Sequence, residues 1–175
     1  MEYVGADLDG TPDIAIAPDG TLDAPDAQYD LLLSFQVIEH VRDLETYFAE
    51  ARRVLRPDGQ MLLSTHGMWL YHPHPEDHRR WTREGLVAEM AAHGFEVVEC
   101  RPVVGPMATT TIIRNTGANH FLRAIPRIGR GVAGLVTLVA NARARLEESV
   151  TPDWVTADNA CVYMTLSRLA PADGR

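Results

Sequence analysis

The 175-residue sequence contains no lysine, so all of its fixed positive charges are arginines. Its formal net charge is −8, and acidic residues crowd the N-terminal end before Arg42, the first arginine. Proteins that follow a nucleic-acid backbone carry clustered positive charge. We therefore expect no nucleic-acid partner.

Cysteines and long apolar stretches are also scarce. Cys100 and Cys161 sit in apolar surroundings at no metal-ligand spacing, which argues against a disulfide framework and favours a reducing compartment. The longest apolar run, residues 131–140, is about half of the roughly 20 residues that a membrane span needs. The chain opens without a signal-peptide pattern. We expect a cytoplasmic protein without membrane contact.

The sequence does contain the alternation of strands and helices that is typical of an α/β domain. Hydrophobic residues make up 46% of the chain, enough for one domain over residues 1–175. Asp43 and Thr82 each precede an apolar run at helical spacing and can cap a helix. The pattern favours a sheet with helices on both faces. The predicted strands lie within 3–7, 13–17, 29–41, 60–65, 95–104 and 159–169.

Residues 118–150 interrupt this alternation with two helical stretches that carry apolar and arginine side chains. Leu135, Leu138 and Leu146 fall on one face of the second stretch. We interpret the segment as a helical insertion before the last strand, in which a helix pair covers the sheet. A lid over an acceptor pocket, a dimer contact and an anionic membrane surface are the alternatives.

Residues 29–65, YDLLLSFQVIEHVRDLETYFAEARRVLRPDGQMLLST, resemble the fourth strand, following helix and fifth strand of class I S-adenosylmethionine-dependent methyltransferases. The likeness rests on Glu-His after the first strand and on Arg-Val-Leu-x-Pro-x-Gly before the second. The segment THGMWLYHPHPEDHRRWTREGL is similar to the post-strand segment of a subset of these enzymes. The resemblance covers about residues 3–104. It implies a Rossmann-like methyltransferase sheet and S-adenosylmethionine as cofactor.

The resemblance assigns two acidic residues to the cofactor. Asp7 matches the acid that ends the second strand and accepts hydrogen bonds from the ribose hydroxyls, with Asp9 as a nearby substitute. A carboxylate suits this role because it offers two acceptor oxygens to two vicinal hydroxyls. Asp19, followed by Gly20, matches the acid that takes the adenine amino group. In the alternative interpretation, these acids only form or solvate turns.

The end of the central strand supplies further predicted cofactor contacts. Ser34, Phe35 and Gln36 lie where open α/β sheets place ligands, beyond the carboxyl ends of the strands. Gln36 can both donate to and accept from the cofactor. Glu39 and His40 match the family's Glu-His pair, and we assign His40 a structural role.

The sequence departs from the family in one respect. The first strand and its Gly-x-Gly-x-Gly turn, which lets the backbone approach the methionine part of the cofactor, have no match. We expect an N-terminally truncated sheet with an exposed edge or gap at this place. A truncated start site, a partner polypeptide, strand exchange in a homodimer and a rearranged sheet without cofactor are the open alternatives.

The segment after the predicted strand at 60–65 is rich in histidine. Imidazoles and carboxylates suit zinc or iron, but Pro73 and Pro75 stiffen the chain between the possible ligands and no second cluster completes a site. We therefore expect a loop that faces the substrate, and no metal. The residues considered are His66, His72, His74, His78, Glu76 and Asp77.

Two of these histidines are predicted to be catalytic. Methyl transfer to a hydroxyl needs a base, and a neutral imidazole can take a proton at cellular pH, so His66 and His72 are the candidates. The predicted acceptor contacts are Tyr71, Asp77, Arg80 and Trp81. Core packing of Trp81, and pairing of Arg80 with Asp77 or Glu76, are the alternatives.

These features predict a methyltransferase-like protein that acts on a small-molecule acceptor, such as a sugar or another natural product. The competing hypothesis is a catalytically silent relative that serves as an interaction or assembly subunit. Either a homodimer or a partner chain that completes the sheet is compatible with both.

Overall fold

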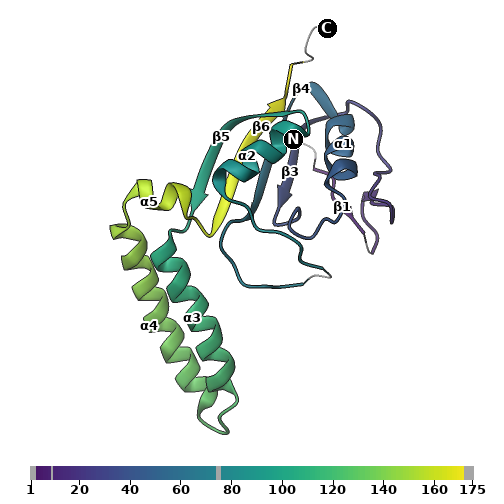
Figure 1. Cartoon of the computed structure of the whole chain (residues 1–175). Helices are drawn as coiled ribbons and strands as arrows, with labels where there is room; N and C mark the ends of the chain where they lie inside the picture. Colours follow the sequence, from purple (N-terminus) through teal and green to yellow (C-terminus); the bar gives the residue numbers. More distant parts are fainter. Residues whose placement is uncertain (1–2, 9, 74–75, 172–175) are drawn as a thin grey trace.

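The computed structural model describes residues 3–8, 10–73 and 76–171. Its centre is a four-stranded mixed sheet in the order β3-β4-β6-β5 (Figure 1). Strands β3 and β4 run parallel, whereas β6 pairs antiparallel with both β4 and β5. The predicted α/β class is therefore confirmed. The bounds are β3 (Tyr29–Phe35), β4 (Leu55–His66), β5 (Phe95–Val103) and β6 (Val162–Leu169).

Helices α1 (Leu44–Val54) and α2 (Arg83–Ala92) begin at the two predicted caps. The side chain of Asp43 accepts from the backbone N–H of Thr46, and the Thr82 hydroxyl accepts from the N–H of Gly85. These bonds satisfy N–H groups that the first helical turn leaves without intrahelical partners. Both caps are local in sequence, and both predictions are confirmed.

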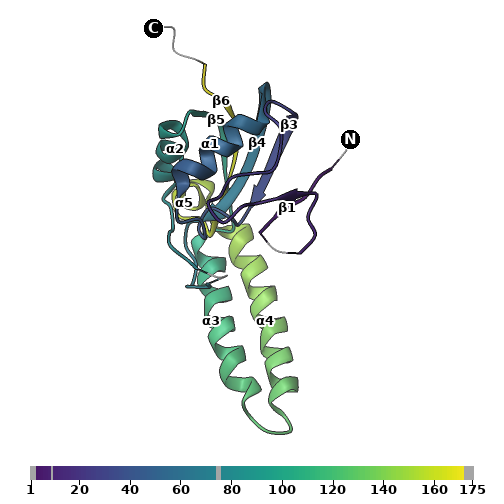
Figure 2. The same cartoon turned by 90° about the vertical axis from the view of Figure 1, so that its right-hand side faces the viewer.

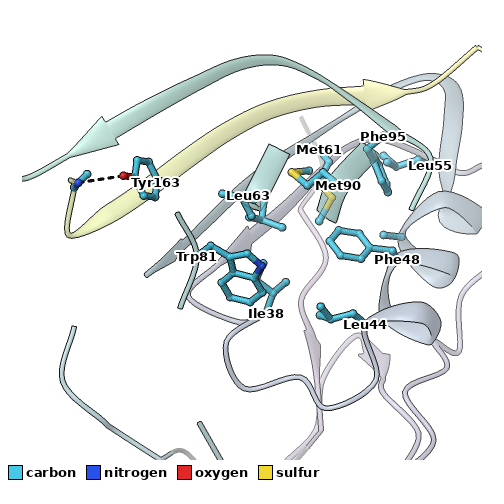
Figure 3. Packing of buried hydrophobic residues seen from close by; sticks show 13 residues of the cluster. Ile38, Leu44, Phe48, Leu55, Met61, Leu63, Trp81, Met90, Phe95 and Tyr163 are labelled. Atoms are coloured by element: carbon cyan, nitrogen blue, oxygen red, sulfur yellow. Dashed lines mark hydrogen bonds between the residues drawn. The ribbon is translucent and has the colours of Figure 1, made fainter. Parts of the chain in front are cut away.

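The hydrophobic core lies between the sheet and the two helices. Figure 3 shows Phe48 from α1 beside Met90 from α2 and Met61 and Leu63 from β4, with Tyr163 of β6 at the far end. All five are almost fully buried, and each contributes about 1.5–3 kcal/mol through burial of apolar surface. The Tyr163 hydroxyl also accepts a hydrogen bond from the backbone of Ala160, so the core extends to the turn before β6.

Helices α1 and α2 lie on the same side of the sheet in Figure 2. Within the described residues no helix covers the opposite face, so the expected cover on both faces is wrong. On β3, Leu31, Leu33 and Phe35 point away from the core and are 42%, 45% and 47% exposed. Leu33 pairs with Leu62 of β4. We call these four residues the uncovered face.

The N-terminal segment forms a separate two-stranded parallel sheet of β1 (Ala6–Asp7) and β2 (Ile14–Ala15). In the described ranges neither strand pairs with the main sheet, and β3 bonds only to β4. The sheet therefore ends at β3, and the expected exposed edge is confirmed. Arg53 of α1 holds the segment by donating to the Leu22 carbonyl and the Asp26 carboxylate.

Between β5 and β6 the chain forms an antiparallel helical hairpin of α3 (Pro106–Arg123) and α4 (Gly129–Val150), followed by the short α5 (Asp153–Asp158). Both views show the hairpin extending away from the sheet (Figures 1 and 2). The expectation that it covers the sheet is therefore wrong, and its first helix begins at Pro106 rather than near residue 118. Of the helices described, none combines the length and apolar character required to cross a membrane.

Candidate functional site

The parallel strands β3 and β4 bring their carboxyl ends together at one edge of the sheet, where Phe35 pairs with Ser64. Gln36 follows at once with a positive φ of 57°, a conformation that costs energy for a residue with a Cβ. Its backbone N–H donates to the Ser64 carbonyl at 3.0 Å and its Nε2 donates to Ser64 Oγ at 3.1 Å. Gln36 Oε1 is buried without a hydrogen-bond partner. The strand end therefore holds an acceptor aimed at no protein group.

Ser34, the other polar residue at this strand end, is already bound within the protein. Its Oγ accepts from the hydroxyl of Tyr47 at 2.5 Å. Burial raises the pKa of Tyr47 to about 12, so this phenol stays protonated and continues to donate. The side chain of Ser34 is buried, and it fixes α1 against β3.

Three histidines from different parts of the chain meet beside this edge. His66 is the last residue of β4, His40 lies in the turn after β3, and His72 lies on the loop after β4. The ring centroids of His66 and His72 are 4.9 Å apart, those of His40 and His72 are 5.0 Å apart, and both pairs are edge-to-face. Trp69 stacks on His66 at 5.8 Å.

Glu39, in the turn after β3, is the acidic residue of this cluster. Its side chain is fully buried; Oε2 accepts from the Thr65 hydroxyl at 2.9 Å, and Oε1 lies 3.5 Å from His66 Nε2. Burial, together with the nearby positive Arg80 and with His72, lowers the pKa of His66 to about 4. His66 is therefore neutral at cellular pH, and its contact with Glu39 is no ion pair there.

The loop after β4 is tied to the cluster by backbone bonds. The N–H of Trp81 donates to the carbonyl of His66 at 3.1 Å, and the N–H of His78 donates to the carbonyl of Glu39 at 2.8 Å. Asp77 accepts two hydrogen bonds from Arg80 and a third from the backbone N–H of His72 at 2.9 Å. Arg80 holds the pKa of the Asp77 carboxyl far below its usual range. This pair therefore sets the position of His72.

The predicted acceptor contacts lie in different environments. Tyr71 is 74% exposed, whereas Trp81 is 7% exposed and belongs to the core. Asp77 is almost fully buried in its pair with Arg80. Of the four, Tyr71 is the side chain that solvent reaches most freely, and the roles of all four toward an acceptor stay predictions. His74, considered with this loop, lies outside the described residues.

The two acids assigned to the cofactor lie in the N-terminal segment. Asp7 is exposed at the end of β1, and its carboxylate accepts from the N–H of Leu8. Asp19 is exposed in the turn after β2, where the Thr21 hydroxyl and N–H bind its carboxylate and lower its pKa. Gly20 takes a φ of 89° in the same turn. Asp9 lies outside the described residues. The contacts of Asp7 and Asp19 with a cofactor remain predictions.

The sequence did not indicate that Glu39 belongs with His66 and His72. One side-chain donor atom from each residue lies within 4.8 Å of the others. Glu39 follows β3, His66 ends β4 and His72 follows it, so the parallel pairing of these strands brings the three residues together. The sequence contained one signal for this: Glu39 and His66 lie at or just after the carboxyl ends of two predicted strands, and parallel strands end at the same edge of a sheet.

Comparison with known proteins identifies the fold and the family. Residues 2–100 match a family described as a methyltransferase domain, which is more than half of the chain. The chain belongs to this methyltransferase family. The resemblance of residues 29–65 to S-adenosylmethionine-dependent methyltransferases is therefore confirmed.

Three bacterial relatives support this assignment. A probable S-adenosylmethionine-dependent methyltransferase of Mycolicibacterium smegmatis is 37% identical over 43% of this chain and 32% of its own length. One from Mycobacterium tuberculosis is 32% identical over 65% of this chain and 42% of its own. A malonyl-[acyl-carrier protein] O-methyltransferase of Geobacter sulfurreducens is 27% identical over 86% of this chain and 63% of its own length. The methyltransferase chain thus spans less than two thirds of each of these relatives.

A solved structure shows the same fold. The crystal structure of the [4+2]-cyclase SpnF superimposes with a TM-score of 0.51 and 19% identity, over 86% of this methyltransferase chain and 53% of the cyclase. At this identity the likeness concerns the fold alone.

Proposed function

We propose that this protein binds S-adenosylmethionine and transfers its methyl group to a hydroxyl of a small molecule. The observation that carries the proposal is the meeting of Gln36, Glu39, His66 and His72 at the carboxyl ends of two parallel strands. Open α/β sheets bind their ligands at this place. Family membership supports S-adenosylmethionine as the cofactor, which supplies an electrophilic methyl group on a sulfonium.

Gln36 gives the cofactor a fitting contact. Its Oε1 is buried and unpaired, and native proteins pair nearly all such atoms. An amino or hydroxyl group of the cofactor would satisfy it as a donor. Asp7 and Asp19 are the proposed acceptors for the ribose hydroxyls and the adenine amino group, and Ser34, Phe35 and Gly20 the proposed lining.

The acceptor side of the proposed site contains His66 and His72. When oxygen attacks the methyl carbon, the O–C bond forms, the S–C bond breaks, and the hydroxyl proton must leave. The neutral His66 has a free lone pair at cellular pH. We propose that this cluster takes the proton, with Tyr71 contacting the acceptor at the exposed side.

Isothermal titration with S-adenosylmethionine tests the cofactor step. We expect micromolar binding, and a loss of about 10-fold for Gln36→Ala because one hydrogen bond to the cofactor is worth about 1.4 kcal/mol. Gln60→Ala is the matched control, since Gln60 is an exposed glutamine on β4, and it should bind like the parent protein.

One observation favours a second candidate function, that of a catalytically silent assembly subunit. Strand β3 ends the sheet with an apolar, half-exposed surface at Leu31 and Leu33, which a partner chain or a second copy would cover. Absence of heat at millimolar S-adenosylmethionine, in the isolated protein, would contradict the enzyme proposal and favour this candidate.

A further inference from the structure

Three of the buried polar atoms that lack a hydrogen-bond partner in the described part of the chain belong to one cluster: Glu39 Oε1, His66 Nδ1 and His72 Nε2. A buried polar atom without a partner costs about 1–3 kcal/mol, and native proteins rarely leave one unexplained. Here three such atoms come from residues whose donor atoms lie within 4.8 Å of one another. A ligand shared by the three side chains would give unpaired atoms of this cluster a partner.

The charge of the cluster indicates what kind of ligand this is. Glu39 is fully buried, and burial of a carboxylate is costly unless a positive charge accompanies it. Among the described residues, His66 is the basic side chain that lies within 4.0 Å of the Glu39 carboxylate. Both imidazoles present nitrogen lone pairs, so the site offers acceptors and needs a cation.

The donor set matches the preferences of divalent transition metals. One carboxylate and two imidazoles bind zinc and iron, and three protein ligands leave a further position open for water or substrate. Ligands at about 2.0–2.1 Å from a tetrahedral ion are about 3.3 Å apart. The separations of up to 4.8 Å therefore have to contract by about 1.5 Å. His72 lies on a loop rather than on a strand or helix, so its side chain can make this movement while its backbone N–H stays bound to Asp77.

Neighbouring groups already orient the three ligands. The Thr65 hydroxyl binds the second carboxylate oxygen of Glu39 at 2.9 Å, and Trp69 stacks on His66. Asp77, held by Arg80, fixes the backbone of His72. Metal sites use such outer contacts to set the direction of their ligands.

We propose that Glu39, His66 and His72 bind a divalent transition-metal ion of the zinc type. This changes the expectation from the sequence, in which the histidine-rich segment holds no metal. It also deepens the proposed function, on which its catalytic meaning rests. A cation here would bind the acceptor oxygen and lower the pKa of its hydroxyl, so that the proton would leave to solvent instead of to His66 or His72.

Zinc titration of the chelator-treated protein, without S-adenosylmethionine or acceptor, tests the site directly. We expect one zinc ion per chain by calorimetry, and visible absorption bands of low-coordinate cobalt when Co²⁺ replaces zinc. His72→Ala should weaken zinc binding at least 10-fold and change the cobalt bands. His72 is partly exposed on a loop, so this variant should fold, and circular dichroism checks that it does.

His120→Ala is the matched control, because His120 is exposed on α3, and it should bind zinc like the parent protein. Failure of the parent to bind zinc, or equal affinity in the parent and His72→Ala, would overturn the proposal. Since no cofactor is present, a negative result here is distinct from a negative titration with S-adenosylmethionine. Glu39→Gln, which keeps the shape but removes the charge, should weaken zinc binding as well.

Discussion

Glu39 and His66 lie far apart in the sequence, yet Oε1 of one is 3.5 Å from Nε2 of the other. Each residue is placed by its own strand: Glu39 by the turn after β3, His66 by the last position of β4. The carboxylate is held on its other side by Thr65, so its orientation does not depend on His66 alone. A single hydroxyl therefore helps to keep the cluster in order.

Removal of that hydroxyl should be costly. In Thr65→Val the buried Glu39 carboxylate loses its hydrogen bond at 2.9 Å, and we expect the free energy of unfolding to fall by about 2 kcal/mol. Urea denaturation followed by circular dichroism measures the change.

Thr165→Val is the control for the loss of a hydroxyl. Thr165 is also fully buried, but its hydroxyl contacts the sulfur of Met90, a weak acceptor. Its replacement should destabilise the protein less than Thr65→Val. Equal decreases in the free energy of unfolding would show that the hydrogen bond from Thr65 does not stabilise the Glu39 carboxylate.

At the scale of elements, α1 joins the N-terminal segment to the rest of the protein. Glu50 on α1 binds the backbone N–H of Leu22 at 2.7 Å and pairs with Arg53, which itself donates to the Leu22 carbonyl. The hydrogen bonds from Arg53, and after them that from Leu22, lower the pKa of Glu50. The turn that carries Asp19 comes just before this attachment.

The attachment should depend on pH. Because the pKa of Glu50 is lower in the folded than in the unfolded protein, its stabilisation is present above about pH 4.5 and is lost as the pH falls through the folded value. Glu50→Gln should lower the melting temperature at neutral pH and make it less dependent on pH below 4.5. Differential scanning calorimetry between pH 3 and 7 measures both effects.

Glu84→Gln serves as the comparison, since Glu84 is exposed on α2; its melting curve should follow that of the parent protein. Identical pH dependence in Glu50→Gln and the parent would contradict the role of Glu50.

The sequence predicted elements whose signals are local and missed those that depend on distant contacts. Asp43 and Thr82 predict the starts of their helices because a capping side chain forms its hydrogen bond with a backbone N–H in the first helical turn. The start of α3 at Pro106 was missed because Gly105 makes no side-chain cap. The strand predicted at 60–65 begins earlier, at Leu55, and therefore includes the Arg-Pro-Asp-Gly stretch. Gly59 within that strand lies against the Tyr29 carbonyl, where a Cβ would come within 3.0 Å.

The candidate site was predictable in part for the same reason. The motifs placed His66 and His72 together because they are close in the chain. The addition of Glu39 required the parallel register of β3 and β4, which no local pattern contains. The mutual pairing of Asp77 and Arg80 appeared only as one alternative, because the sequence does not specify which charges a loop buries.

At the scale of the whole molecule, the described helices cover the sheet on one side only. Leu31, Leu33, Phe35 and Leu62 form the uncovered face, and β3 has a free edge within the described ranges. Contiguous apolar surface of this kind is uncommon on isolated soluble domains.

The uncovered face should bind an apolar dye such as 8-anilinonaphthalene-1-sulfonate in the native state. Leu33→Gln should reduce the fluorescence by about half while changing the unfolding free energy by less than about 1 kcal/mol, since Leu33 is 45% exposed. Leu146→Gln, at a 64% exposed leucine of α4, should leave the fluorescence unchanged. An equal reduction in both variants would place the dye elsewhere.

The hairpin of α3 and α4 also affects how the molecule moves in solution. With 22 residues, α4 is about 33 Å long, comparable to the diameter of a small domain, and it extends to one side of the sheet (Figure 1). Rotation about the hairpin axis should therefore be faster than rotation across it. Nitrogen relaxation in NMR would then report longer correlation times for helical N–H vectors, which lie along that axis, than for strand N–H vectors that cross it.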